Sequence, residues 1–236
     1  MNIRQSIAFG LIALMIASVA SSQSYPSFPG EETDQRTLRT QERVDELFDS
    51  GAYDRAYRIY RRDLAPRGDK YAQYMVGYMH LTGAGVPQEP VVALAWYRIA
   101  AERGEPSVSL ARDKLEKTLT ASQIAAADVL FADLRNELSD RVLLLKLVRH
   151  DLAILRSSVS AGGSPGAVNM TVIDRRYGVA SGAYYYQIIQ KRLDRRLTYL
   201  KGQVKVVDIE GDPHTKELGE IELEIKKLAA EINKQQ

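Results

Sequence analysis

The sequence contains no cysteine among its 236 residues. This absence excludes disulfide bonds, thiolate zinc sites, iron–sulfur clusters and thiol nucleophiles. Histidine is also scarce, with 3 residues, so a histidine-rich metal site is not expected. No stretch is apolar over the roughly 20 residues that a membrane-spanning helix needs. What is present is an ordinary globular composition, 45% hydrophobic and 26% charged, which excludes a wholly disordered chain.

Motifs for catalysis are missing as well. The sequence has no G-x-S-x-G, H-E-x-x-H, Walker A or dinucleotide-binding pattern. His150 and Asp151 are adjacent, so they cannot face one another on a helix, and His214 follows a proline in an expected turn. The carboxylates are spread over expected helix surfaces and form no acid–base pair. We therefore expect no enzymatic activity, no metal and no cofactor.

The first twenty residues have the order of a secretory signal peptide. Arg4 precedes an apolar run over residues 7–19, and small residues then place the cleavage site after Ala20, with Ser22 as the alternative. An uncleaved membrane anchor is the competing interpretation, but the small residues favour cleavage. Residues 21–37 begin with a stretch rich in Ser, Pro and Gly and predict a flexible leader. The expected product is an exported protein.

Residues 38–140 carry apolar side chains at helical spacing, three and four positions apart. Thr120 and Gln123 are spaced as a capping box at the start of the last of these helices. Short turns that contain Gly or Pro separate the helices, so neighbouring helices should pack antiparallel as a stack of hairpins. The apolar stripes run through residues 53–64, 72–79, 92–100 and 124–138.

The stretch from Ala72 to Gly104 is more specific and reads AQYMVGYMHLTGAGVPQEPVVALAWYRIAAERG. It resembles the Sel1-like repeat, a relative of the tetratricopeptide repeat (TPR). That family has a Gly in the first helix, a G-x-G-V turn, and A-x-x-W-Y-x-x-A-A-x-x-G in the second helix. Val76, His80 and Glu89 stand where the family usually has Leu, an aromatic residue and Asp. The matching positions are Gly77, Gly83, Gly85, Val86, Ala93, Trp96, Tyr97, Ala100, Ala101 and Gly104.

The residue types at these positions make physical sense. Gly77 and the pair Ala100–Ala101 omit large side chains where two helices would approach closely. Gly83 and Gly85 permit a positive φ in a tight loop. Trp96, the only tryptophan, is expected in the core between hairpins and not at a ligand site.

One repeat cannot bury its own apolar face, so neighbouring hairpins are expected at residues 40–70 and 106–140. The resemblance implies a protein-interaction scaffold, because members of this class typically serve in signalling and envelope assembly. With the signal peptide it also implies an adaptor in the bacterial periplasm, secretion beyond the cell being the alternative. The side chains expected to be exposed on the repeat and to contact a partner protein are Gln73, His80 and Arg98.

The charge is unevenly distributed along the chain. Residues 31–140 carry 15 Lys/Arg against 19 Asp/Glu, residues 141–205 carry 12 against 3, and residues 206–236 carry 4 against 8. The middle block is therefore strongly basic, at +9, between two segments of −4. Such a block suits an anionic surface.

Residues 141–236 predict further helices. Residues 142–155 are apolar nearly all round, which indicates a buried helix. Residues 157–166, SSVSAGGSPG, predict a hinge, and residues 167–173 carry some β-propensity. Residues 184–205 predict a basic helix with one apolar face.

The last segment shows a heptad pattern after the expected helix start at Asp212–Pro213. Its natural partner is the basic helix, in an antiparallel hairpin. The alternative is an exposed helix over residues 215–236 that docks onto a partner or a second copy. The seam residues are Leu218, Ile221, Ile225, Leu228 and Ile232.

Together these patterns predict an all-α fold, a short Sel1/TPR-like helical-hairpin solenoid (38–140) followed by a basic region with a C-terminal, coiled-coil-like hairpin (141–236). The alternative function is a binding module for anionic phospholipid, lipopolysaccharide or peptidoglycan, and nucleic acid is not expected for an exported protein. The basic residues assigned to that alternative are Arg175, Arg176, Lys191, Arg192, Arg195 and Arg196.

Overall fold

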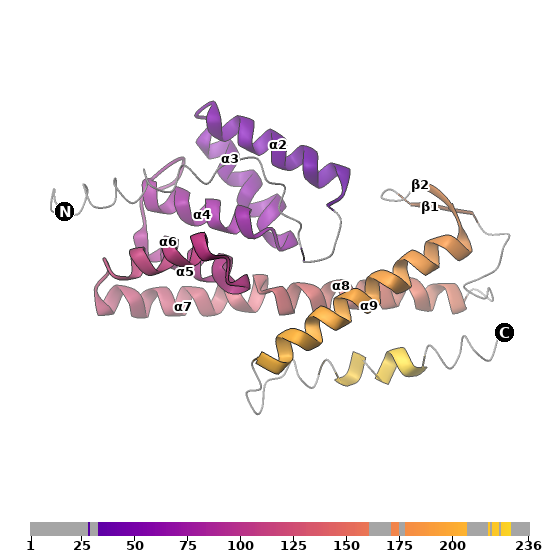
Figure 1. The fold of residues 1–236 in the computed structure, drawn as a ribbon. Coiled ribbons are helices and arrows are strands. Elements are labelled where there is room, and N and C mark those ends of the chain that lie inside the picture. Colours follow the sequence, from indigo (N-terminus) through magenta and orange to yellow (C-terminus); the bar gives the residue numbers. More distant parts are fainter. Residues whose placement is uncertain are drawn as a thin grey trace. The chain divides into compact units, whose positions relative to one another are not determined.

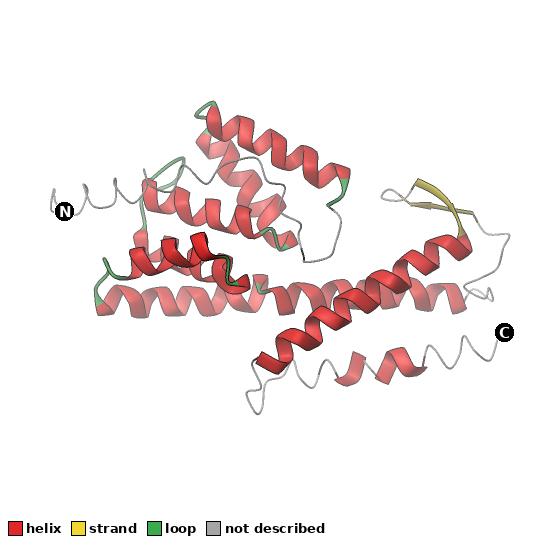
Figure 2. Cartoon of the chain, viewed as in Figure 1, coloured by secondary structure: helices red, strands yellow, loops and turns green. Residues whose placement is uncertain are grey.

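The structure is a computed structural model that describes Phe28 and residues 33–160, 171–174, 178–206, 217, 219–221 and 223–227. The described residues are mainly helical, with one short two-stranded sheet, which confirms the all-α prediction (Figures 1 and 2). The chain divides into two compact units, residues 1–143 and 144–236. The signal peptide expected in residues 1–20 lies outside the described residues.

The first unit is a succession of helices joined by short turns, as the periodicity predicts (Figure 1). Its first helix begins at Gln35, where the side chain of Asp34 accepts a hydrogen bond from the Thr37 N–H at 3.0 Å. The last residues of the predicted leader, 21–37, are therefore helical. In chain order the elements are α2 (Gln35–Asp49), α3 (Tyr53–Ile59), the π-helical η2 (Tyr60–Leu64), the 3-10 helix η3 (Ala65–Arg67), α4 (Lys70–Thr82), α5 (Pro90–Ala100), the 3-10 helix η4 (Ala101–Arg103), α6 (Pro106–Glu116) and α7 (Ala121–Leu138).

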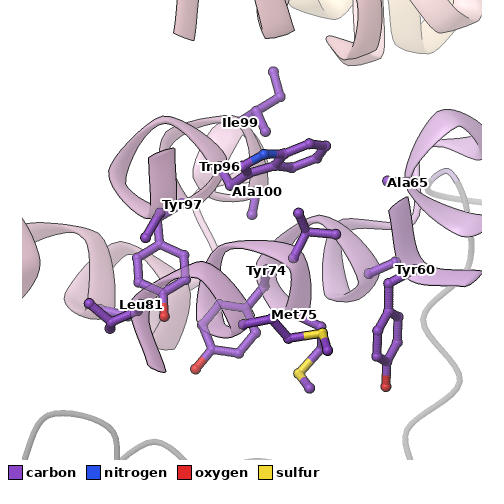
Figure 3. Close-up of a cluster of buried hydrophobic side chains, with 14 of the residues drawn as sticks. Tyr60, Ala65, Tyr74, Met75, Leu81, Trp96, Tyr97, Ile99 and Ala100 are labelled. Carbon is purple, nitrogen blue, oxygen red and sulfur yellow. The ribbon is translucent and has the colours of Figure 1, made fainter. Parts of the chain in front are cut away.

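The core of this unit is the close packing of α4 on α5. Gly77 makes it possible, because a Cβ at that position would lie 2.7 Å from Cδ1 of Tyr97 and 3.1 Å from Cβ of Trp96. The Tyr97 ring, fully buried, stacks on Tyr74 with 5.2 Å between centroids. Figure 3 shows these aromatic side chains among the aliphatic residues of the same cluster. The expected role of Gly77 is confirmed.

The loop between α4 and α5 packs against the preceding hairpin. Gly85 has φ +73°, and a Cβ there would lie 2.5 Å from the backbone N of Asp54 and the backbone C of Tyr53, where α3 begins. The backbones of the loop and of α3 thus touch directly, which only glycine allows. Gly104, at the end of η4, has almost the same φ of +72° but nothing within 4 Å of its would-be Cβ.

The last helix of the unit starts with the predicted capping box. The Thr120 hydroxyl accepts a hydrogen bond from the Gln123 N–H at 3.3 Å, and the Gln123 side chain accepts one from the Thr120 N–H at 2.9 Å. Ala127 and Leu138 are buried, so α7 uses the expected stripe to pack on the stack.

The helix α8 (Asp140–Ser160) begins in the last residues of the first unit and continues into the second. The second unit also contains the antiparallel strands β1 (Thr171–Asp174) and β2 (Gly178–Ser181), and α9 (Gly182–Val206). The expected burial of the Leu-rich helix is confirmed, since Leu144, Val148 and Leu152 of α8 are buried. The predicted hinge, residues 157–166, is wrong for its first four residues, which continue α8. No glycine interrupts the helix there, and the Ser157 hydroxyl donates to the Ile154 carbonyl at 2.8 Å. Residues 161–166 lie outside the described residues.

The apolar face predicted for the basic helix is confirmed in α9, where Ile189, Leu193 and Leu200 are buried. Val172 and Ala180, an opposed pair in the sheet, are half-buried, while the next pair, Ile173 and Val179, is exposed. Among the described helices, none combines the length and the apolar character needed to cross a membrane.

We predict that Gly85→Ala destabilises the first unit more than Gly104→Ala does. Both changes place alanine at a positive φ, which costs about 1 kcal/mol. Only Gly85→Ala adds a clash with backbone, which costs about 1–3 kcal/mol more. Urea unfolding followed by Trp96 fluorescence measures the difference. Equal losses in the two variants would contradict the packing described for this loop.

Candidate binding surfaces

A hollow of about 200 Å³ opens in the first unit between η2, α5 and α7. Its lining combines apolar side chains with a few charged ones, as surfaces that bind proteins commonly do. The lining residues are Arg61, Val92, Ala95, Trp96, Leu130, Asp133, Leu134 and Glu137.

Trp96 is buried as expected, with 3% of its surface exposed. Part of its ring is covered by a charged side chain, that of Arg61. The Arg61 guanidinium lies 4.9 Å from the centroid of the indole ring, within the range of a cation–π interaction. A long arginine side chain can move at low cost when another group replaces it on the ring. Trp96 is thus both a core residue and the floor of the hollow.

The helix α7 exposes two large apolar side chains to solvent. Val129 is 65% exposed and Leu130 is 37% exposed. The outer helix of a repeat stack normally carries a polar face toward solvent. No role was expected for Leu130 from the sequence, although its position outside the packed stripe of residues 124–138 was a signal for it. Leu130 lines the hollow and gives it an exposed apolar side chain.

Gln73 is fully buried, so the expectation that it contacts a partner from an exposed position is wrong. Its amide nitrogen donates to the Ala65 carbonyl at 3.2 Å, and its amide oxygen accepts from Lys70 Nζ at 3.1 Å. Gln73 thus makes hydrogen bonds with a backbone carbonyl of η3 and with a lysine of α4. Helical spacing alone does not predict these contacts.

His80 is also buried rather than exposed, with 7% of its surface accessible. Its Nε2 lies 3.1 Å from the Tyr57 hydroxyl and its Nδ1 lies 3.4 Å from a Glu89 carboxylate oxygen. Burial lowers the pKa of His80, and the nearby charge of Glu89 opposes that shift only in part. The imidazole fills the place between α3 and α4, consistent with a packing role.

Arg98 is half-buried and engaged in ion pairs, which also departs from the expected free side chain. It binds Glu116 at 3.1 Å and also pairs with Asp128. The arginine therefore connects α5 to both α6 and α7, and its charge serves the packing of the stack.

Comparison with known families gives one match, in which residues 70–105 fit the model of the Sel1 repeat. The chain contains a Sel1 repeat. The matched residues are α4, the glycine loop, α5 and η4, so the resemblance inferred from the motif is confirmed. No curated protein and no solved structure matches the chain. Sel1 repeats generally mediate protein–protein interaction.

A buried group of charges closes the end of the Sel1 repeat. Lys70 Nζ lies 2.7 Å from a Glu102 carboxylate oxygen and 3.0 Å from one of Asp140. Arg103 donates to both oxygens of Asp140, at 2.6 and 2.9 Å, and to the Gly68 carbonyl at 3.0 Å. These contacts join the start of α4, the end of the Sel1 repeat and the first residue of α8.

Burial alone would raise the pKa of Asp140, but the hydrogen bonds from Arg103 and the charge of Lys70 outweigh it and lower that pKa. Asp69, also buried, shows the opposite result: burial dominates and raises its pKa although it accepts from the Ala72 N–H. The two carboxyl groups therefore affect stability at acid pH with opposite signs.

The basic block of the second unit is partly used inside the fold. Asp151 is fully buried and accepts hydrogen bonds from Nε of Arg192 at 3.2 Å and Nη1 of Arg196 at 2.7 Å. The expectation that Arg192 and Arg196 present their charge to an external surface is therefore wrong. Lys191 and Arg195 are exposed on α9. Arg175 and Arg176 lie outside the described residues.

The described part of the C-terminal segment makes its ion pairs with α8, whereas sequence analysis paired it with the basic helix. Glu217 binds Arg149 at 2.7 Å, and Glu224 pairs with Arg156. Both pairs advance by seven positions in the same direction, and Ile221 between them is buried. Two arginines of α9, Arg192 and Arg196, bind Asp151. Self-association through residues 215–236 stays a prediction.

Among the residues that the structure describes, no group of three or more potential metal ligands is found. The described side chains offer two candidate binding surfaces: the hollow beside Trp96, and the exposed Lys191 and Arg195 of α9.

We predict that Asp140→Asn lowers the free energy of unfolding at neutral pH by about 3 kcal/mol, because it leaves Lys70 and Arg103 without their buried counter-charge. The folded pKa of Asp140 is below its ordinary value of 3.8, so its charge stabilises the fold above that value. This contribution is lost as the pH falls through the folded pKa.

The difference between wild type and variant should therefore shrink in acid. Urea unfolding at several pH values, from neutral to about pH 3, measures it. The opposite contribution of Asp69 is common to both proteins and cancels in the difference. A difference that stays constant into acid would show that the Asp140 charge has no such role.

Proposed function

We propose that this protein is an exported adaptor of the bacterial cell envelope, which binds a partner protein at the hollow between η2, α5 and α7. One observation carries the proposal: the hollow is lined by the only tryptophan of the chain and by Leu130, an exposed apolar side chain of α7. The family's general role in protein–protein interaction supports the same class of function.

The hollow has the properties of a binding hot spot. Tryptophan and arginine side chains at the centre of a surface contribute most when a partner excludes water from them. Arg61 shields the indole from water in the free protein, and an apolar partner side chain can take over that role. Asp133 supplies a polar edge that can orient the partner.

The alternative function, binding of an anionic surface, has less support. It relied on a row of basic residues, and two of them, Arg192 and Arg196, bind the buried Asp151 inside the second unit. Lys191 and Arg195 are exposed on α9, and each charge near an anionic layer adds only about 1 kcal/mol of attraction.

We predict that Leu130→Asp abolishes capture of the partner protein while Leu110→Asp does not. Both leucines are exposed on helices of the same unit, at 37% and 54%, but only Leu130 lines the hollow. A charge at position 130 should weaken binding at least tenfold, about 1.4 kcal/mol, because it would be desolvated in the complex.

The measurement is capture from an envelope extract of the source bacterium on immobilised full chains, read by quantitative mass spectrometry. A protein that binds wild type and Leu110→Asp but not Leu130→Asp is the expected partner. If every protein retained by wild type is retained equally by Leu130→Asp, the hollow is not the binding site. Circular dichroism confirms that both variants are folded.

Export rests on the sequence of the first twenty residues and is tested separately. We predict that the mature protein begins at Ser21, or at Gln23 if cleavage follows Ser22. Intact-mass measurement of the protein recovered from the periplasm decides this. A chain that keeps its first twenty residues, recovered with the cytoplasm, would contradict the proposed location.

A further inference from the structure

Phe28 is buried although it belongs to the predicted leader. Only 2% of its surface is exposed, and its ring lies 5.1 Å from the guanidinium carbon of Arg103. The expectation of a flexible leader over residues 21–37 is therefore wrong at this position too. The side chain of Phe28 therefore binds to the folded part of the chain in the same way as a side chain of a peptide ligand would.

The partner of Phe28 is a rigid platform. Arg103 is fixed in its plane by three hydrogen bonds, two to Asp140 and one to the Gly68 carbonyl, and its side chain is 17% exposed. Because all three bonds lie in the plane of the guanidinium, a face of that group is left for an aromatic ring. A cation–π contact of this kind is strongest where water is excluded.

Thr37, at the start of α2, also contacts this part of the first unit. Thr37 is 2% exposed, and its hydroxyl accepts a hydrogen bond from Arg67 Nη1 at 2.9 Å. Arg67 ends η3 and immediately precedes Gly68, whose carbonyl holds Arg103. Thr37 thus contacts Arg67, and Phe28 contacts Arg103, which binds the carbonyl of the neighbouring Gly68.

We propose that the face of Arg103 is a docking site for an aromatic side chain of a peptide, and that Phe28 in the sequence Pro26-Ser27-Phe28-Pro29 is its resident ligand. The site belongs to the end of the Sel1 repeat and shares no lining residue with the hollow at Trp96. It does not depend on the adaptor proposal, and its occupant is a segment of this same chain.

The affinity of this site has a lower bound. A short tether holds its ligand at an effective concentration in the millimolar range. Because Phe28 is almost completely buried, we expect its site to be mostly occupied in the intact chain. The same sequence supplied as a separate peptide must then bind with a dissociation constant below about 1 mM once the resident side chain is removed.

The test uses full-length chains and a fluorescent peptide with the sequence of residues 21–33. We predict that Phe28→Ala binds this peptide with a dissociation constant below about 1 mM, and that wild type binds it at least about twofold more weakly because Phe28 competes in cis. A peptide in which alanine replaces Phe28 should not bind. Fluorescence anisotropy measures all three.

Two further chains serve as controls. Phe48→Ala removes an aromatic side chain that contacts Tyr53 and Tyr78 elsewhere in the unit, and it should create no peptide binding. Arg103→Lys, combined with Phe28→Ala, keeps a cation beside Asp140 but removes the planar face, and it should lower peptide affinity several-fold.

Folding of each chain is checked by Trp96 emission and by thermal unfolding. If Phe28→Ala proves too unstable, Phe28→Leu keeps an apolar side chain in place and should bind the peptide with intermediate affinity. In either variant the peptide should raise the midpoint of unfolding. A folded Phe28→Ala chain that ignores the peptide up to about 1 mM, or that binds the alanine peptide equally well, overturns the proposal.

Discussion

The close approach of α4 and α5 is the constraint on which the first unit depends. It exists because Gly77 has no side chain, which lets the ring of Tyr97 occupy that space. With Tyr97 turned toward α4, its neighbour Trp96 is turned toward η2 and α7, where Arg61 covers it. The absence of a side chain at Gly77 thus places Tyr97 against α4 and leaves Trp96 to line the hollow.

Each unit also contains a group of buried charges that joins residues distant in the sequence. Asp140 collects Lys70 and Arg103 at the end of the Sel1 repeat, and Asp151 collects Arg192 and Arg196 in the second unit. Pairs of this kind cost much free energy when one partner is lost, and they add specificity to a helical stack whose apolar contacts alone are tolerant. Much of the charge that looked available for binding therefore supports the fold.

The features that can be predicted from the sequence are those that depend on residues close to one another in the chain. Helical spacing and the repeat motif are enough to predict the role of Gly77, the burial of Trp96 and the capping box at Thr120. Partners that are remote in sequence are not predicted in this way. Arg192 meets Asp151 across 41 positions, and periodicity places such an arginine on a polar face without showing that another helix covers it. Phe28 was missed for the same reason, since its partner Arg103 lies far along the chain; the aromatic residue between two prolines was the available signal.

The central claim is that the α4–α5 hairpin is the stable centre of the first unit and positions both the hollow at Trp96 and the docking site at Arg103. Native-state hydrogen exchange on the full chain tests it most directly. We expect the amides of α4 and α5 to exchange last in this unit and with one common free energy of opening, while those of α2, α6 and the outer part of α7 exchange earlier. Amides of α4 that exchange before those of α2 or α6 would contradict it.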